Sequence, residues 1–155
     1  MNISDIVQAG SVLSPLHAQN KKQLLTEIAN ALAAAAGVEP RPVFEALLQR
    51  EKLGSTGLGQ GIAIPHGRVA GLTKVHGVFV RLSHPIAFEA TDGEPVDLIF
   101  ALASPPESGA DHLTALARVS RLLRDSVTLA KLRGAESAEG LYAILTQPTI
   151  TATAA

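Results

Sequence analysis

The stretch from Val96 to Ala103 constrains the fold more than any other part of the chain. It is apolar at every position except Asp97. Such a continuous run is expected of a central strand that is buried on both faces of a sheet. A second strand is predicted from Val75 to Leu82. Helical patterns lie before and after these two strands, so the sequence predicts an α/β sandwich.

The helical pattern is clearest from Asn20 onwards. Asn20 can cap a helix that has a glutamine three residues later, and Gly37 is a natural stop for it. A second helix is predicted from Arg41 to Leu53, with Pro42 in its first turn, so the two helices form an αα-hairpin. Three later helices are expected: one opened by Asp111, one from Ser126 to Arg133, and one from Ser137 to Leu145.

The whole chain, residues 1–155, is predicted to be a single domain, because its length is typical of one. The first residues are expected to form a short helix or turn that leads into a strand. Turns are expected at Ser14–Pro15 and at His84–Pro85. Residues 147–155 are expected to be a flexible tail.

The composition excludes several classes of function. Hydrophobic residues make up 46% of the chain and charged residues 17%, which excludes a disordered protein. A net charge of −1 and an aromatic content of 3% argue against a nucleic-acid partner. The chain has no cysteine, which excludes disulfides and thiolate metal sites. No apolar run is long enough to span a membrane and no signal peptide is visible, so we expect no membrane insertion and a cytoplasmic location.

The segment between Gly54 and Gly61 contains four glycines in eight residues. Such a loop can bring its backbone amides close to an anion. It does not match the Rossmann fingerprint, because its glycines read G-x-G-x-G and follow a helix. It does not match the Walker loop either, because no lysine lies between Gly54 and His66. Neither nucleotide-binding motif is therefore indicated.

The glycine-rich segment leads to His66, which stands between Pro65 and Gly67. Proline restricts the backbone before the histidine, and Gly67 removes bulk beside its imidazole. A neutral imidazole is a good nucleophile near pH 7. Next to an amide-rich loop, it is suited to accepting a phosphoryl group. The alternative is a turn histidine that only bonds backbone carbonyls.

The run from Arg50 to Gly67 (REKLGSTGLGQGIAIPHG) resembles the active-site signature of the IIA domains of the phosphoenolpyruvate-dependent phosphotransferase system. It is most similar to the mannitol/fructose type, and within that type to the nitrogen-regulatory branch. The resemblance extends over nearly the whole chain. It implies a mixed five-stranded sheet with helices on both faces, and phosphorylation of His66 at Nε2 by an HPr-like phosphocarrier protein.

The same resemblance implies two partners for His66 in the site, Arg50 and His112. Arg50 offers a permanent cation with the geometry to bind phosphate, or it is a solvated arginine at a helix end. His112 follows the expected cap Asp111, where helix amides favour an anion, or it is a surface histidine of a first turn. Arg68 can meet the donor protein or face solvent. The candidate phosphate-binding loop comprises Ser55, Thr56, Gly57, Gly59, Gly61 and Gly67, of which Ser55 and Thr56 can instead only shape the turn.

No cofactor and no metal are expected, because the five histidines lack H-x-x-x-H or H-E-x-x-H spacing. Three functions remain. The first is a phosphoryl carrier that regulates target proteins of nitrogen or potassium metabolism according to its phosphorylation state. The second is a sugar-transport IIA protein that passes the phosphoryl group to a IIB partner. The third is a binding module that is not phosphorylated. The free-standing chain and the nitrogen-type motif favour the first.

Overall fold

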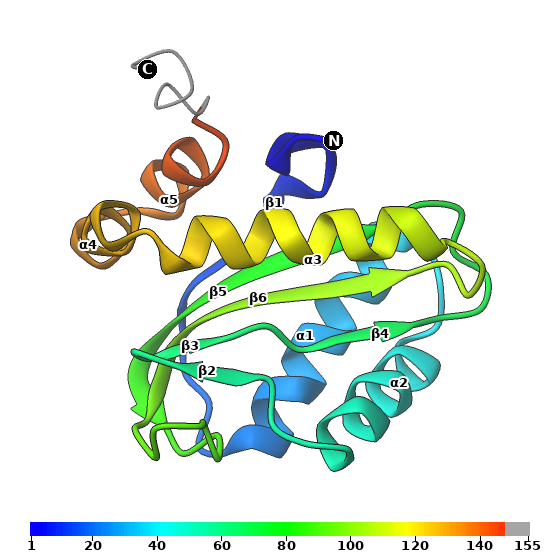
Figure 1. Ribbon diagram of the computed structural model, residues 1–155, viewed down its shortest axis with the longest axis horizontal. Coiled ribbons are helices and arrows are strands. Elements are labelled where there is room, and N and C mark those ends of the chain that lie inside the picture. Colours follow the sequence, from blue (N-terminus) through cyan, green and yellow to red (C-terminus); the bar gives the residue numbers. More distant parts are fainter. Residues whose placement is uncertain (148–155) are drawn as a thin grey trace.

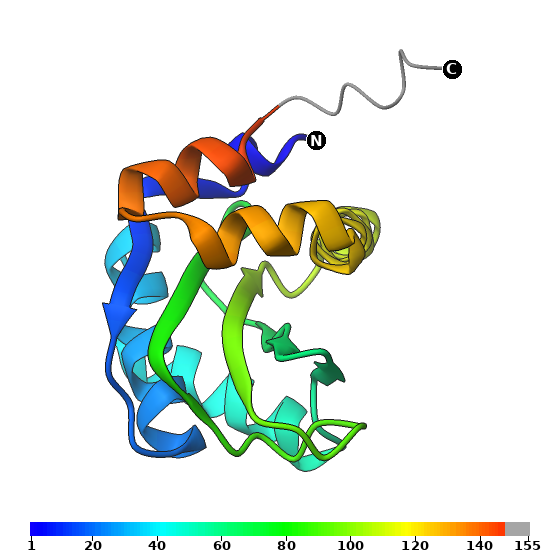
Figure 2. The same cartoon turned by 90° about the vertical axis from the view of Figure 1, so that its left-hand side faces the viewer.

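The computed structural model describes residues 1–147 and shows a twisted sheet with helices on both faces (Figures 1 and 2). The predicted α/β class is therefore confirmed. The elements in chain order are a short 3-10 helix η1 (Ile3–Asp5), β1 (Val7–Leu16), α1 (Lys21–Ala36), α2 (Pro40–Lys52), β2 (Gly57–Gly59), β3 (Ile62–Ala63), β4 (His66–Arg68), β5 (His76–Ile86), β6 (Val96–Ser104), α3 (Gly109–Arg124), α4 (Ser126–Gly134) and α5 (Ala138–Leu145).

The sheet is mixed and has the strand order β1-β5-β6-β3-β2. β1 runs parallel to β5, whereas β5 is antiparallel to β6. β3 and β4 both pair in parallel with β6, at successive positions along it: Ile62 lies opposite Leu98, and His66 opposite Leu102. The six strands thus occupy five places across the sheet, because β3 and β4 share one place on either side of Pro65. This arrangement agrees with the predicted five-stranded sheet.

β6 is the central strand that its apolar run predicted. Ile99 and Ala101 pack with α1 and α2 on one face. Phe100 and Leu102 pack with α3, α4 and α5 on the other. All four residues are completely buried. The layers are visible in Figure 2, where the sheet lies between the two sets of helices.

The predicted αα-hairpin is also confirmed, because its signals are local. The Asn20 side chain accepts a hydrogen bond of 2.8 Å from the Gln23 amide at the start of α1. Gly37 ends that helix with a φ of 72°, which a glycine adopts without strain. α2 begins one residue before the predicted start and ends one residue before Leu53. The predicted helices near residues 126–133 and 137–145 correspond to α4 and α5.

Four local predictions are wrong. Ser14–Pro15 lies inside β1, and His84–Pro85 lies inside β5, so neither forms the expected turn. β1 is an edge strand, where a proline needs no partner for a missing amide, and β5 has an irregular register between Arg81 and Ile86. Asp111 is not a cap, because α3 begins at Gly109 and its N-cap is Ser108.

The fourth correction concerns the glycine-rich segment, which is a β-hairpin rather than an open loop. β2 and β3 pair antiparallel, and Gln60 and Gly61 between them have φ values of 58° and 81°. The Asp92 carboxylate accepts a hydrogen bond of 3.0 Å from the Gln60 amide and so supports the turn. Of the predicted tail at 147–155, residues 148–155 lie outside the described residues. None of the helices in residues 1–147 is long and apolar enough to cross a membrane.

Candidate active site

His66 is the first residue of β4, and its backbone position is fixed from two sides. The Pro65 carbonyl accepts a hydrogen bond of 2.9 Å from the Leu102 amide of β6. On the other side, Gly67 lies against α2, where an added Cβ would stand 3.0 Å from the Cβ and 3.1 Å from the carbonyl carbon of Ala46. The close approach of α2 therefore favours a residue without a side chain at position 67, and the role of Gly67 beside the imidazole stays a prediction.

The His66 imidazole has a defined proton position. Its Nδ1 lies 2.8 Å from the Ile64 carbonyl oxygen. A carbonyl can only accept a hydrogen bond, so Nδ1 carries the proton and Nε2 keeps a free lone pair. Burial lowers the pKa of His66 below 6.5, and the positive charge of Arg50 lowers it further, while the Ile64 hydrogen bond and Glu51 act in the opposite direction. At pH 7 the ring is neutral, which is the nucleophilic form.

His112 is the second imidazole of the site. It lies in the fourth position of α3, is only 6% exposed, and its ring centroid is 5.6 Å from that of His66. Its Nδ1 is 2.6 Å from the hydroxyl oxygen of Ser104, the last residue of β6. Burial lowers the pKa of His112, and the charges of Arg68 and His66 act in the same direction. The structure thus brings together two imidazoles that are 46 residues apart in the sequence.

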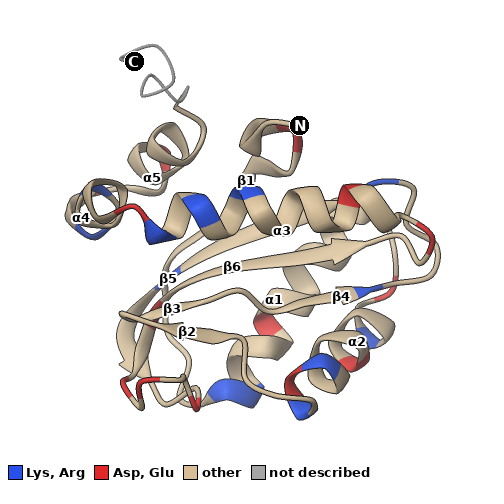
Figure 3. Cartoon of the chain, in the orientation of Figure 1, with Lys and Arg blue, Asp and Glu red and all other residues tan. Residues whose placement is uncertain are grey.

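Two arginines act on these rings through their charge. Arg50, near the end of α2, donates from Nη1 to the Gly54 carbonyl over 2.8 Å and depresses the pKa of His66. Arg68, two residues after His66, donates to the Pro106 carbonyl over 3.3 Å and depresses the pKa of His112. Figure 3 shows blue segments, which mark lysine and arginine, on both α2 and β4. Sequence reasoning named Arg50 as a site residue but left Arg68 out of the site.

The Thr56 amide, at the start of the glycine-rich segment, already binds an anion that belongs to the protein itself. The buried carboxylate of Glu51 accepts a hydrogen bond from the Thr56 amide over 3.1 Å and another from the Thr56 hydroxyl. The Ser55 hydroxyl donates to the Phe88 carbonyl over 2.8 Å and accepts from the Gly57 amide over 3.0 Å. These contacts give the three residues a role in shaping the loop, and phosphate binding by them stays a prediction.

Lys21 completes this buried cluster. Its ammonium lies 2.9 Å from the Glu51 carboxylate and 4.3 Å from the centroid of the Phe88 ring. The cluster joins the start of α1, the end of α2 and the segment before β2. Sequence reasoning missed both Lys21 and Glu51, because no local pattern pairs residues that are 30 positions apart.

Gly59 and Gly61 flank the hairpin turn. Gly61 has side chains of Arg133 and Asp97 packed against its α-carbon, and Arg133 also donates to the Gln60 carbonyl over 2.7 Å. Ile62, next to this turn, lies opposite Leu98 of β6, and His66 lies opposite Leu102. The two positions are therefore separated by four residues along β6, which is about 13 Å. The geometry therefore explains both glycines by the turn, and their phosphate-binding role stays a prediction.

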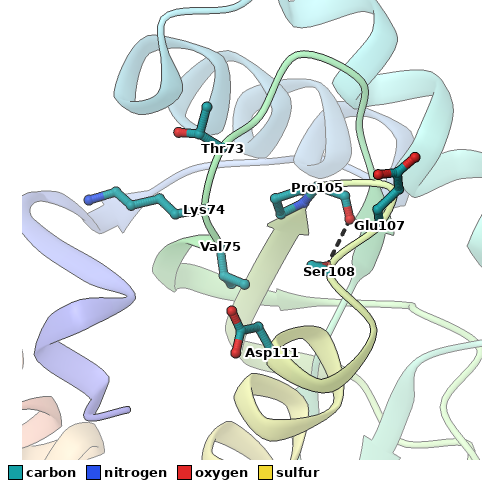
Figure 4. A pocket seen from close by; sticks show the side chains of 7 residues that line it. All are labelled: Thr73, Lys74, Val75, Pro105, Glu107, Ser108 and Asp111. Atoms are coloured by element: carbon teal, nitrogen blue, oxygen red, sulfur yellow. Dashed lines mark hydrogen bonds between the residues drawn. The ribbon is translucent and has the colours of Figure 1, made fainter.

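A shallow pocket of about 230 Å³ lies near the end of β6 (Figure 4). It is lined by residues 73–75, Pro105, Glu107, Ser108 and Asp111. The Ser108 hydroxyl donates to the Pro105 carbonyl over 2.8 Å, as the dashed line in Figure 4 shows. Neither histidine of the site belongs to this pocket. Within residues 1–147, no group of three or more histidine, aspartate or glutamate side chains is arranged to hold a metal ion.

Comparison with known proteins gives one consistent result. Residues 5–147 match the family described as "Phosphoenolpyruvate-dependent sugar phosphotransferase system, EIIA 2". The nitrogen regulatory protein of Bradyrhizobium diazoefficiens is 50% identical over 152 residues, which cover 98% of this chain and 99% of that protein.

Solved structures agree with this family. The crystal structure of the nitrogen regulatory protein IIA-Ntr from Neisseria meningitidis superimposes with a TM-score of 0.88 at 40% identity, covering 93% of this chain and 99% of that one. The crystal structure of IIA mannitol from Escherichia coli has a TM-score of 0.75 at 24% identity, with coverage of 89% and 97%, and so shows the same fold.

Proposed function

This chain belongs to the EIIA 2 family of the phosphoenolpyruvate-dependent sugar phosphotransferase system, and we propose that it carries a phosphoryl group on Nε2 of His66. The observation that carries this proposal is the hydrogen bond from Nδ1 of His66 to the Ile64 carbonyl. It leaves the lone pair of Nε2 free, and the lowered pKa keeps the ring neutral at pH 7.

The donor is an HPr-like phosphocarrier protein that is itself phosphorylated on a histidine. Nε2 of His66 attacks the phosphorus, and a new N–P bond forms as the N–P bond of the donor breaks. The electron pair of the broken bond returns to the donor imidazole. Nδ1 of His66 keeps its proton throughout, so its hydrogen bond to the Ile64 carbonyl stabilises the positive charge that develops on the ring.

His112, Arg50 and Arg68 stabilise the charge of the transferred group. Arg50 and Arg68 supply two permanent cations whose fields reach the two rings. His112 supplies a hydrogen-bond donor 5.6 Å away, measured between ring centroids. Replacing His112 by alanine is expected to slow phosphoryl transfer by about 10²-fold, the usual cost of losing one such donor.

The phosphoryl group then regulates partner proteins in the cytoplasm. A phosphate adds about −1.5 to −2 charges to a site whose histidines are neutral, which is enough to change which proteins dock there. The relatives named nitrogen regulatory protein support this role over sugar transport. Transfer to a IIB partner remains the second candidate, because the family description names the sugar phosphotransferase system.

The test is phosphoryl transfer from phosphoenolpyruvate through an enzyme I-type protein and an HPr-like carrier. The wild-type chain, His66→Ala and the control His84→Ala are compared by intact mass and by acid lability of the product. His84 is an exposed histidine at the far end of β5. We expect one acid-labile phosphoryl group on the wild type and on the control, and none on His66→Ala. If a carrier that phosphorylates another IIA protein leaves the wild type unmodified, the proposal is wrong.

A further inference from the structure

Ser104 contacts the second histidine of the site from a buried position. Its side chain is completely buried, and its hydroxyl oxygen lies 2.6 Å from Nδ1 of His112. The backbone around it is fixed, because its carbonyl accepts a hydrogen bond of 2.8 Å from the Val69 amide and it pairs with Arg68 across β4 and β6. Within residues 1–147, Nδ1 of His112 is the one hydrogen-bond partner of this hydroxyl.

The contact can be made with either of two proton arrangements. If Nδ1 of His112 carried the proton, it would donate to the Ser104 oxygen, and the buried hydroxyl proton would be left without an acceptor. If the hydroxyl donates to Nδ1, its proton is satisfied and the ring proton resides on Nε2. Leaving a buried donor unpaired is the more costly arrangement, so the second is favoured.

We propose that Ser104 is a positioning residue of the phosphoryl-transfer site. Its hydroxyl donates to Nδ1 of His112 and so keeps the ring proton on Nε2, and this N–H donates a hydrogen bond to the phosphoryl group. This inference rests on the function proposed above for His66. The two imidazoles then hold opposite tautomers. The Ile64 carbonyl gives His66 a free lone pair on Nε2, and the Ser104 hydroxyl gives His112 a donor on Nε2.

Ser104→Ala removes this hydroxyl, and Ser108→Ala is the matched control. Ser108 lies in the same connection between β6 and α3, but its hydroxyl donates to the Pro105 carbonyl and not to either histidine. The two variants and the wild type are labelled with ¹⁵N in their histidines. Long-range proton–nitrogen NMR of the unphosphorylated chains then reads which nitrogen of His112 is protonated. Phosphoryl acceptance is measured on the same samples over a range of donor concentrations.

In the wild type and in Ser108→Ala we expect Nδ1 of His112 to give the signal of an unprotonated acceptor and Nε2 that of a protonated nitrogen. In Ser104→Ala the Nδ1 signal moves towards that of a mixture of tautomers. Its maximal transfer rate falls about 10-fold, the equivalent of one hydrogen bond, with an unchanged dependence on donor concentration.

A protonated Nδ1 on His112 in the wild type would overturn the inference, and this reading does not need Ser104→Ala to fold. A wild-type transfer rate in a folded Ser104→Ala would overturn it as well. The tautomer is read without any phosphoryl transfer, so a wild-type chain that accepts no phosphoryl group would refute the proposed function separately.

Discussion

Replacing Glu51 by alanine is expected to lower the free energy of unfolding by about 3–5 kcal/mol, the usual cost of removing one partner from a buried ion pair. The Glu51 side chain is 2% exposed and holds three donors: the Lys21 ammonium at 2.9 Å, the Thr56 amide at 3.1 Å and the Thr56 hydroxyl. In the variant both Thr56 donors lose their acceptor, and Lys21 loses its nearest carboxylate.

The size of this loss in unfolding free energy depends on which acceptors and how much solvent each donor still has after Glu51 is removed. Thr56 is 5% exposed, so its two unpaired donors cost about 1–3 kcal/mol each. Lys21 contributes less, because its ammonium is 20% exposed and still has the Glu89 carboxylate at 3.7 Å. The loss is therefore a large part of the roughly 5–15 kcal/mol that stabilises a domain.

Urea denaturation followed by circular dichroism measures this effect. A loss of this size shifts the midpoint by about 2 M when the slope is about 2 kcal/mol per M. Glu45→Ala is the matched control on the same helix, because the Arg41–Glu45 pair has exposed fractions of 88% and 59%; its loss is expected to stay below about 0.5 kcal/mol. A loss below about 1 kcal/mol for Glu51→Ala would refute the assignment of Glu51 as the internal anion of the loop.

Three further predictions concern pH and the packing of β4. Because burial lowers the pKa of His66 below 6.5, its NMR titration midpoint is expected below that value, and a midpoint above 6.5 would contradict the neutral nucleophile. The pKa values of His76 and His112 are also lowered by burial. Near and below pH 6.5 the unfolded chain therefore binds more protons than the folded chain, which favours unfolding. The urea midpoint should therefore be lower at about pH 5.5 than at about pH 7.5, and an equal or higher midpoint would oppose this. Gly67→Ala should cost about 1–3 kcal/mol, because the new Cβ meets the backbone of α2, while Gly10→Ala, with no atom within 4 Å, should change the urea midpoint little; equal effects would refute this reason.

The parts of the fold that were predictable from sequence depend on local signals. The apolar run of β6 indicated its burial on both faces, and Asn20 and Gly37 marked the ends of α1 through their own backbone preferences. The two X-Pro turns were wrong because pairing within the sheet overrides a local turn preference at an edge or an irregular register. Asp111 was misplaced as a cap because α3 begins two residues earlier, at Gly109, without a side-chain cap: the N-cap residue Ser108 donates its hydroxyl to the Pro105 carbonyl instead.

The candidate site was predictable only where a motif carried it. The segment ending in Pro65–His66–Gly67 indicated His66 as the proposed nucleophile, and the resemblance supplied His112 and Arg50 as candidates. Ser104 and Glu51 were not predictable, because their roles arise from tertiary contacts. The Ser104 hydroxyl meets His112 only after β6 and α3 pack. Lys21 reaches Glu51 only once α1 and α2 lie side by side.

Locating the phosphorus on one imidazole nitrogen tests the central claim most directly. The chain is labelled with ¹⁵N in its histidines, phosphorylated through the HPr-like carrier, and studied by proton–nitrogen NMR with phosphorus coupling. We predict that the phosphorus is bonded to Nε2 of His66 and that Nδ1 keeps its proton, because Nδ1 donates to the Ile64 carbonyl. Phosphorus on Nδ1 of His66, or on any other histidine, would contradict the account.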